Sequence, residues 1–145
     1  MEAEADPGGF VKGGLAMVEQ RLRELGYTLP ESVKPAAVYV PGVLADGLLF
    51  TSGQLPVVDG EIKYQGRLGE DLTTAQGQAA AQLCALNGLA VIKQLIGDLN
   101  QVEQIVKVVG YVSSAPGFYE QSQVINGASD LLGQVFGQSG RHARS

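Results

Sequence analysis

The chain has 145 residues, a formal net charge of −5 and 45% apolar residues. This length suits one compact domain, and the apolar share predicts a globular fold and argues against disorder. The acidic charge disfavours nucleic acid as a partner, because a nucleic-acid surface needs a basic stripe, but it permits a local basic pocket. No signal-peptide pattern opens the chain and no apolar run approaches the ~20 residues that cross a bilayer, so we expect a cytoplasmic protein with no membrane partner.

The first part of the chain is predicted to precede the main domain. Residues 1–13 are expected to form a flexible tail, and residues 14–36 an amphipathic helix followed by a linker. Apolar residues recur there at helical spacing, and Gly26 suits the left-handed residue that ends a helix. The residues of this apolar stripe are Leu15, Val18, Leu22 and Leu25.

The main domain, residues 37–145, begins with two predicted β-hairpins. Apolar runs flank Asp46-Gly47 and then Asp59-Gly60, and both dipeptides favour a type I′ turn. A glycine-rich connection follows the second hairpin. These signals predict that the N-terminal part of the domain contributes strands to a sheet.

A long helix is predicted over residues 73–96, with Asp71 or Thr73 as its N-cap. Lys93 is the only charged residue between Thr73 and Ile96. A helix so apolar is expected to pack on a sheet and to turn part of its remaining surface to another subunit. The first predicted stripe comprises Leu72, Ala75, Ala79, Leu83, Leu86 and Ala90, and the second comprises Ala80, Cys84, Val91 and Leu95.

Residues 102–115 are typical of a strand, Pro116-Gly117 of a turn, and residues 118–136 of a second helix. The order of elements predicts an α+β fold of two layers, with a further element beginning at Ala143. The core face of the second helix is expected to comprise Val124, Ala128, Leu131 and Val135.

Common catalytic motifs are not visible in this sequence. One cysteine and one histidine disfavour a transition-metal site, and Cys84 is interpreted as a buried structural thiol in a reducing compartment. There is no P-loop, and Ser52 lies outside a Gly-x-Ser-x-Gly motif. His142 could serve a serine as a base, although a lone histidine near a terminus is more often a surface residue.

The order of motifs does, however, resemble the YjgF family, also called Rid proteins or reactive intermediate deaminases. The matching segments are "YVPGVLADGLLFTSGQLPVVDGEI", an alanine-rich helix, "IVKVVGYVSSAPGF", "VINGASDLL" and "HARS", which span residues 37–145. The resemblance implies a chorismate-mutase-like sandwich, with a mixed sheet and two helices on one face. It also implies a homotrimer with ligand clefts between subunits, and hydrolysis of enamines and imines such as 2-aminoacrylate to a keto acid and ammonia, without metal or organic cofactor.

The same resemblance nominates the site residues. Arg144 of the closing Ala-Arg-Ser matches the catalytic arginine that holds the substrate carboxylate, a role suited to the two parallel donors of a guanidinium. Tyr39, Ser52, Gly53 and Asn126 match substrate-binding positions around a small carboxylate or imino acid. Each also has an ordinary structural interpretation: a surface ion pair for the arginine, a core aromatic for Tyr39, a strand-end turn for Ser52 and Gly53, and a solvent-exposed residue for Asn126.

Family members continue past this motif through two more strands, of which the last lies inside the sheet. The chain therefore resembles a fragment of a longer protein, in which we expect unpaired sheet edges, weak trimer formation and an Arg144 placed in a fraying tail. Two alternatives to the deaminase remain open: a carboxylate-binding regulatory module without turnover, and an endoribonuclease or translation inhibitor, which older family names suggest.

Overall fold

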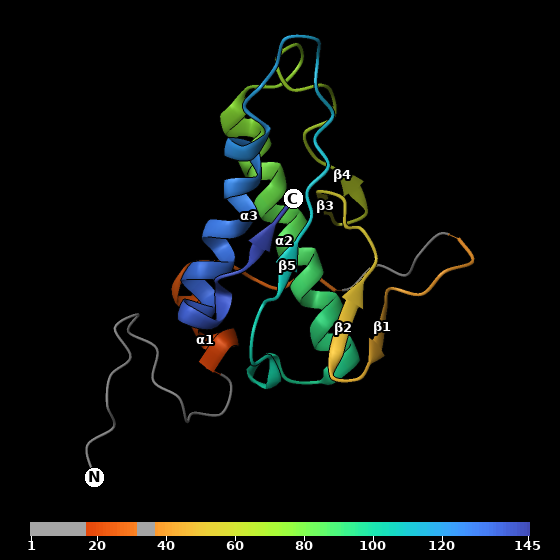
Figure 1. Cartoon of the computed structure of the whole chain (residues 1–145), viewed down its shortest axis with the longest axis vertical. Coiled ribbons are helices and arrows are strands. Elements are labelled where there is room, and N and C mark those ends of the chain that lie inside the picture. The colour runs from red at the N-terminus through yellow and green to blue at the C-terminus, as the bar shows by residue number, and fades with distance from the viewer. Residues whose placement is uncertain (1–16, 32–36) are drawn as a thin grey trace.

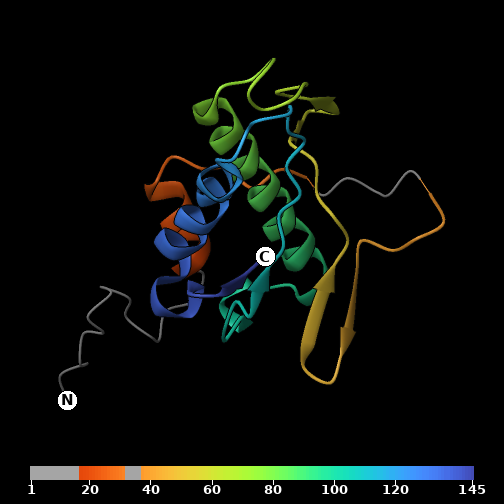
Figure 2. The ribbon, with the colours of Figure 1, turned by 45° about the horizontal axis from the view of Figure 1, so that its top comes forward.

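The computed structural model describes residues 17–31 and 37–145. The predicted tail over residues 1–13 lies outside these ranges, as do residues 14–16 and 32–36. The fold is α+β, with helices in one layer and short strands in the other, as expected (Figures 1 and 2). In chain order the elements are α1 (Met17–Glu24), β1 (Gly42–Ala45), β2 (Leu48–Thr51), β3 (Val57–Val58), β4 (Glu61–Ile62), α2 (Thr74–Ile96), the 3₁₀ helix η1 (Leu99–Gln101), β5 (Lys107–Val108), α3 (Gln121–Phe136), the 3₁₀ helix η2 (Gly137–Gly140) and β6 (Ala143–Arg144).

Helix α1 is short and amphipathic, as its spacing predicts. Val18 and Leu22 are buried, and the Arg21 Nε donates to the carbonyl of Gln134 on α3 at 3.2 Å. Gly26 has a φ of +85°, so it supplies the left-handed backbone expected beyond the end of the helix. The apolar side of α1 thus packs on the end of α3.

Both predicted hairpin turns are confirmed. Asp46 and Gly47 have φ values of 49° and 76°, and Asp59 and Gly60 have values of 52° and 80°, so each pair takes the two positive φ angles of a type I′ turn. Strands β1 and β2 pair antiparallel from Gly42–Thr51 to Ala45–Leu48, and β3 pairs antiparallel with β4. The β1–β2 hairpin extends beyond the helical layer (Figure 2).

Helix α2 is the longest element and confirms the prediction over residues 73–96. Thr73 caps it, because its side chain accepts from the Gln76 N–H at 3.2 Å while the Gln76 side chain accepts from the Thr73 N–H at 2.9 Å. The predicted first stripe is only partly right: Leu86 and Ala90 are buried, whereas Ala75 is exposed. The difference arises because α2 contacts α3 on one side and the hairpins on another.

One buried polar side chain joins α2 to the strand layer. Asn87 is 8% exposed, and its Nδ2 donates to the carbonyls of Leu55 and Val57 at 2.9 and 3.0 Å. These bonds satisfy a buried amide and fix the segment that enters β3 against the middle of α2.

The hydrophobic core lies where α1, α2, η1 and α3 meet. The predicted core face of α3 is confirmed, because Val124, Ala128, Leu131 and Val135 are all buried. The main cluster comprises Val18, Leu22, Leu86, Leu89, Leu99, Leu131, Leu132, Val135 and Phe136. The predicted strand over residues 102–115 is shorter in the structure. Only Lys107–Val108 forms a regular strand, and Ser114 adds an isolated parallel bridge with Leu68.

The strands of the described residues form three separate pairs rather than one continuous sheet. Strand β1 pairs with β2, β3 with β4, and β5 with β6 in parallel. Neither β2 nor β5 has a second described strand beside it, which agrees with the expectation of unpaired edges.

Helix α2 is long and apolar enough to cross a membrane by length and composition, contrary to the expectation that no apolar segment of the chain is long enough. Its contacts are nevertheless those of a core helix: it packs along α3, and its Asn87 is bonded to the strand layer. Apolarity over a wide arc is what a helix covered on two sides requires.

Candidate functional site

The candidate site lies where the end of the chain crosses α3. Ser122, Asn126 and Ser129 follow one another at helical spacing, so they present polar atoms along one line of the helix. The Arg144 guanidinium meets this line: Nη1 donates to Asn126 Oδ1 at 2.8 Å and to Ser129 Oγ at 3.1 Å, and Nη2 donates to the Ser122 carbonyl at 3.1 Å. Two of the predicted site residues, Asn126 and Arg144, are therefore brought together.

Strand β6 pairs with β5 and so holds the backbone of Arg144, while α3 binds its side chain. Val108 of β5 pairs with Arg144, and the neighbouring Ser145 N–H donates to the Val108 carbonyl at 3.0 Å. Gly110 N–H donates in turn to the Ser145 carbonyl at 2.8 Å. The expectation that Arg144 lies in a fraying tail is therefore wrong, because a parallel strand pair and three side-chain bonds anchor it.

The guanidinium is bound to α3 through its two terminal nitrogens. Nη1 makes two of the contacts and Nη2 makes one. Nε makes no hydrogen bond to a residue of the described ranges. Arg144 is an exposed residue, and an edge that pairs Nε with Nη2 has the two parallel donors that match a carboxylate.

A histidine and a serine that the sequence analysis did not select complete the cluster. His142 Nε2 lies 2.8 Å from Ser129 Oγ, and His142 Nδ1 lies 2.6 Å from the carbonyl oxygen of Gly140. The signal available in the sequence was the spacing of Ser129 three residues after Asn126 on the same predicted helix. His142 was considered only as a base for an unidentified serine, because pairing across the fold is not visible in a sequence.

These side chains line a shallow depression of about 300 Å³ beside α3. Its walls are formed by Ser129, Gly133, Gly140, Arg141, His142 and Arg144. Gly133 leaves space here, because a Cβ at that position meets no atom within 4 Å. Two arginines at the rim of an otherwise acidic protein make the depression a local cationic site.

The other predicted residues lie apart from this cluster in the single chain. Tyr39 is 56% exposed and precedes β1, and Ser52 and Gly53 follow β2. The Ser52 Oγ donates to the Val40 carbonyl at 2.6 Å, which ties the two ends of the hairpin together. No hydrogen bond within the described residues joins these three to Asn126 or Arg144.

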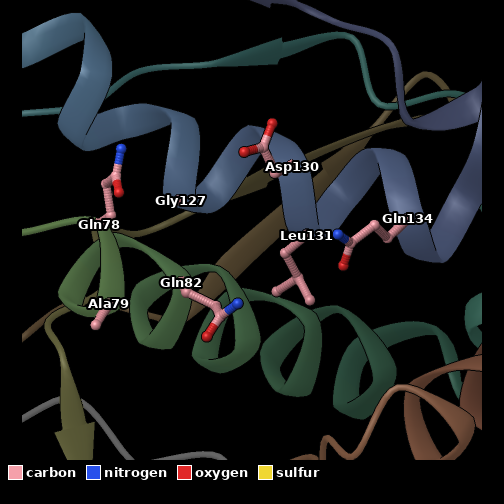
Figure 3. A pocket seen from close by; sticks show the side chains of 7 residues that line it. All are labelled: Gln78, Ala79, Gln82, Gly127, Asp130, Leu131 and Gln134. Atoms are coloured by element: carbon pink, nitrogen blue, oxygen red, sulfur yellow. The ribbon is translucent and has the colours of Figure 1, made fainter. Parts of the chain in front are cut away.

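A second hollow, of about 280 Å³, lies between α2 and α3 on another side (Figure 3). Its amide side chains are already engaged: Gln78 donates to the Gln123 carbonyl at 2.9 Å and Gln82 to the Tyr27 hydroxyl at 2.7 Å. Asp130 points away from α2 in this view. The hollow combines no nucleophile with a base, so it is a weaker candidate than the depression at Arg144.

Neither a metal cluster nor a reactive thiol is found within residues 17–31 and 37–145. No group of three histidine, cysteine, aspartate or glutamate side chains gathers as metal ligands there. Cys84 is partly buried in α2, and desolvation raises the pKa of its thiol to about 11. A thiol held protonated in this way is inert, which agrees with a structural role.

Comparison with known proteins assigns this fold to a class of chorismate-mutase-like α+β proteins. The chain matches a structure of the protein Atu1372 of unknown function from Agrobacterium tumefaciens, with 47% identity, a TM-score of 0.81, and coverage of 89% of this chain and 78% of that one. It also matches a putative endoribonuclease from Shewanella oneidensis MR-1, with 39% identity, a TM-score of 0.86, and coverage of 88% and 85%.

A relative of known sequence, Protein TCP17 of Trypanosoma cruzi, is 46% identical over 128 residues, which are 88% of this chain and 80% of that protein. Residues 19–145 match the family described as "YjgF/chorismate_mutase-like, putative endoribonuclease". The chain belongs to this family, as the motif order predicted.

Proposed function

We propose that this chain hydrolyses small enamines and imines that carry a carboxylate, such as 2-aminoacrylate, to 2-keto acids and ammonia. The observation that carries the proposal is the anchored Arg144, whose Nη1 and Nη2 are bound to α3 while its Nε makes no hydrogen bond to a described residue. Imines react readily with water, so the protein has mainly to hold the carboxylate and place a water molecule. Arg144 is the clamp in this proposal and Asn126 fixes its plane.

Tyr39, Ser52 and Gly53 enter the proposal through a neighbouring copy of the chain. The cross-strand pair Val43 and Phe50 is 53% and 61% exposed. Apolar strand residues left this exposed favour association of copies. We therefore propose a homotrimer in which the hairpin end of one copy walls the Arg144 depression of the next. Light scattering after size-exclusion chromatography measures the association.

The direct test supplies enzymatically generated 2-aminoacrylate and follows ammonia and keto-acid release. Faster release than in the protein-free control supports the proposal. A rate equal to that control, with benzoate or 2-ketobutyrate still binding in calorimetry, supports instead a carboxylate-binding module without turnover.

A second candidate activity, endoribonuclease, is favoured by the description of the family and by that of the matching Shewanella oneidensis structure. The net charge of −5 opposes it, because RNA binding gains most of its affinity from contacts to phosphates. RNA cleavage that co-purifies with the chain and is abolished by Arg144→Ala would favour this activity over deamination.

A further inference from the structure

The neighbourhood of Arg144 contains a bonded chain of four groups. The Gly140 carbonyl contacts His142 Nδ1, His142 Nε2 contacts Ser129 Oγ, and Ser129 Oγ contacts Arg144 Nη1. The distances along it are 2.6, 2.8 and 3.1 Å. The proposed deaminase does not yet use His142 or Ser129, although its reaction requires proton transfers.

The direction of each bond in the neutral form follows from elementary chemistry. A carbonyl oxygen can only accept, so His142 Nδ1 must carry the hydrogen in its contact with Gly140. Nε2 of the neutral imidazole is then a bare acceptor, and the Ser129 hydroxyl must donate to it. The guanidinium can only donate, so Ser129 Oγ accepts from Arg144. This is the bonding of a hydroxyl paired with a base and a third group that orients the base.

The packing of Gly140 fixes the orienting carbonyl. A Cβ at Gly140 would lie 2.2 Å from the Leu132 carbonyl oxygen, so only glycine fits against the end of α3 here. Gly140 is buried in η2, which leads directly into His142. The base is therefore held in one tautomer by the backbone itself and not by a mobile side chain.

The Ser129 hydroxyl retains one free position toward the depression. Its hydrogen is given to His142 and one lone pair accepts from Arg144, which leaves the second lone pair. Ser129 lines the depression, and the missing side chain at Gly133, one turn further along α3, leaves room for a small molecule beside it. A water molecule there can donate to Ser129 Oγ.

We propose that Ser129 and His142 form the proton-transfer pair of this site, an inference that rests on the proposed deamination. 2-Aminoacrylate tautomerises in water to its imine as nitrogen loses a proton and C3 gains one. The water oxygen bonds to the imine carbon as its proton passes to Ser129, Ser129 passes its own proton to His142 Nε2, and the C=N π electrons move to nitrogen. The nitrogen recovers that proton through Ser129, which gives the carbinolamine. The carbinolamine hydroxyl then gives its proton to the same pair, the pair returns it to nitrogen, the C–N bond breaks and ammonia leaves.

The choice of ligand class follows from the geometry of the pair and the clamp. Arg144 Nη1 donates to Ser129 Oγ and both side chains line the same depression, so a carboxylate held by Arg144 shares that depression with the hydroxyl. In a 2-imino acid the carbon adjacent to the carboxylate is the imine carbon. The site therefore suits substrates whose reactive carbon bears the carboxylate, and disfavours those in which a methylene group separates the two.

The test compares wild type with His142→Gln and Ser129→Ala, and uses Ser114→Ala as a matched control. The Gln side chain can accept from Ser129 in place of Nε2 but cannot take up a proton. Ser114 also makes side-chain hydrogen bonds, to the Val112 carbonyl and the Gln121 side chain, away from the depression. Thermal unfolding of each variant verifies that it folds.

For 2-aminoacrylate, we expect kcat to fall about 100-fold or more in His142→Gln and Ser129→Ala while KM stays within about three-fold of wild type. Ser114→Ala should match wild type. If His142→Gln keeps the wild-type kcat, or if the two variants change KM and not kcat, the pair only positions Arg144. Either result overturns the proposal.

A second substrate separates this inference from the deaminase proposal. A proton-transfer pair should also accelerate p-nitrophenyl acetate cleavage, so wild type should release p-nitrophenolate at least about 10-fold faster than both pair variants. If wild type leaves 2-aminoacrylate untouched but shows this ester difference, the deaminase fails and the pair stands. If all variants release p-nitrophenolate equally and wild type does not turn over 2-aminoacrylate, both fail.

Discussion

Arg144 Nη1 lies 2.8 Å from Asn126 Oδ1, although the two residues are 18 positions apart and belong to different elements. Strand β6 supplies the cation and α3 supplies the acceptor, so the site depends on the docking of the chain's end against a helix. This bond helps to orient the guanidinium and does not involve Nε.

Arg144→Lys should weaken carboxylate binding although it conserves the charge. An ammonium group offers no parallel pair of donors and cannot reach three acceptors on α3 at once. We expect affinity for benzoate or 2-ketobutyrate to fall about 10-fold, measured by calorimetry, since one charge-assisted hydrogen bond contributes about 1.5–3 kcal/mol. Equal ligand affinity in Arg144→Lys and wild type would contradict the proposal that the Arg144 guanidinium holds the carboxylate.

Asn126→Asp should reduce ligand affinity more than Asn126→Ala. Alanine removes one bond that orients the guanidinium, whereas aspartate places a carboxylate against Arg144, where it competes electrostatically with an anionic ligand. We expect a loss of about three-fold for alanine and ten-fold or more for aspartate in the same calorimetric titration. Tighter binding in Asn126→Asp would contradict the proposed role of Asn126.

Asn87→Ala should destabilise the fold by about 1–3 kcal/mol, because it removes the buried amide that donates to the carbonyls of Leu55 and Val57. Urea unfolding measures the free energy, and hydrogen exchange should show the greatest loss of protection near β3. Gln20→Ala, which removes an exposed bond to Glu24, is the control and should change stability by less than about 0.5 kcal/mol. A similar decrease in the free energy of unfolding in both variants would argue against a stabilising role of the Asn87 hydrogen bonds.

Leu131→Ala should lower the free energy of unfolding by about 2–5 kcal/mol, since Leu131 is 1% exposed at the centre of the helical core. Leu95 lies on α2 but is 41% exposed, so Leu95→Ala should cost distinctly less. The pair of variants, compared by urea unfolding, tests whether the core lies between the helices as described.

The Cys84 thiol should react slowly with a disulfide reagent at pH 8 in the folded chain and rapidly in urea. Desolvation by burial raises its pKa to about 11, so the reactive thiolate is scarce in the native state. The pKa is lower in the unfolded chain, so this group's contribution to stability is complete below about pH 9 and declines as the pH rises toward 11. Fast labelling of folded protein at pH 8 would mean that Cys84 is more open than described.

Local chemistry in the sequence determined most of the secondary structure. Asp46-Gly47 and Asp59-Gly60 specify their turns because the required positive φ angles suit few other residues, and Thr73 begins α2 because its side chain satisfies a free N–H. Spacing also predicted the buried face of α3. The motif order further identified the family and nominated Arg144 and Asn126.

Only the tertiary structure decided which of the nominated residues meet. Arg144 contacts Asn126, whereas Ser52 lies apart from them on the hairpin. Ser129 and His142 join the site as well. Helix docking and strand pairing bring these positions together, and no local sequence pattern relates them. The tertiary structure also replaced the expected fraying tail by strand β6, since β5 offers a backbone edge that only the folded chain brings beside residues 143–145. Turns and caps are settled by interactions within a few residues, whereas a site depends on contacts across the whole fold.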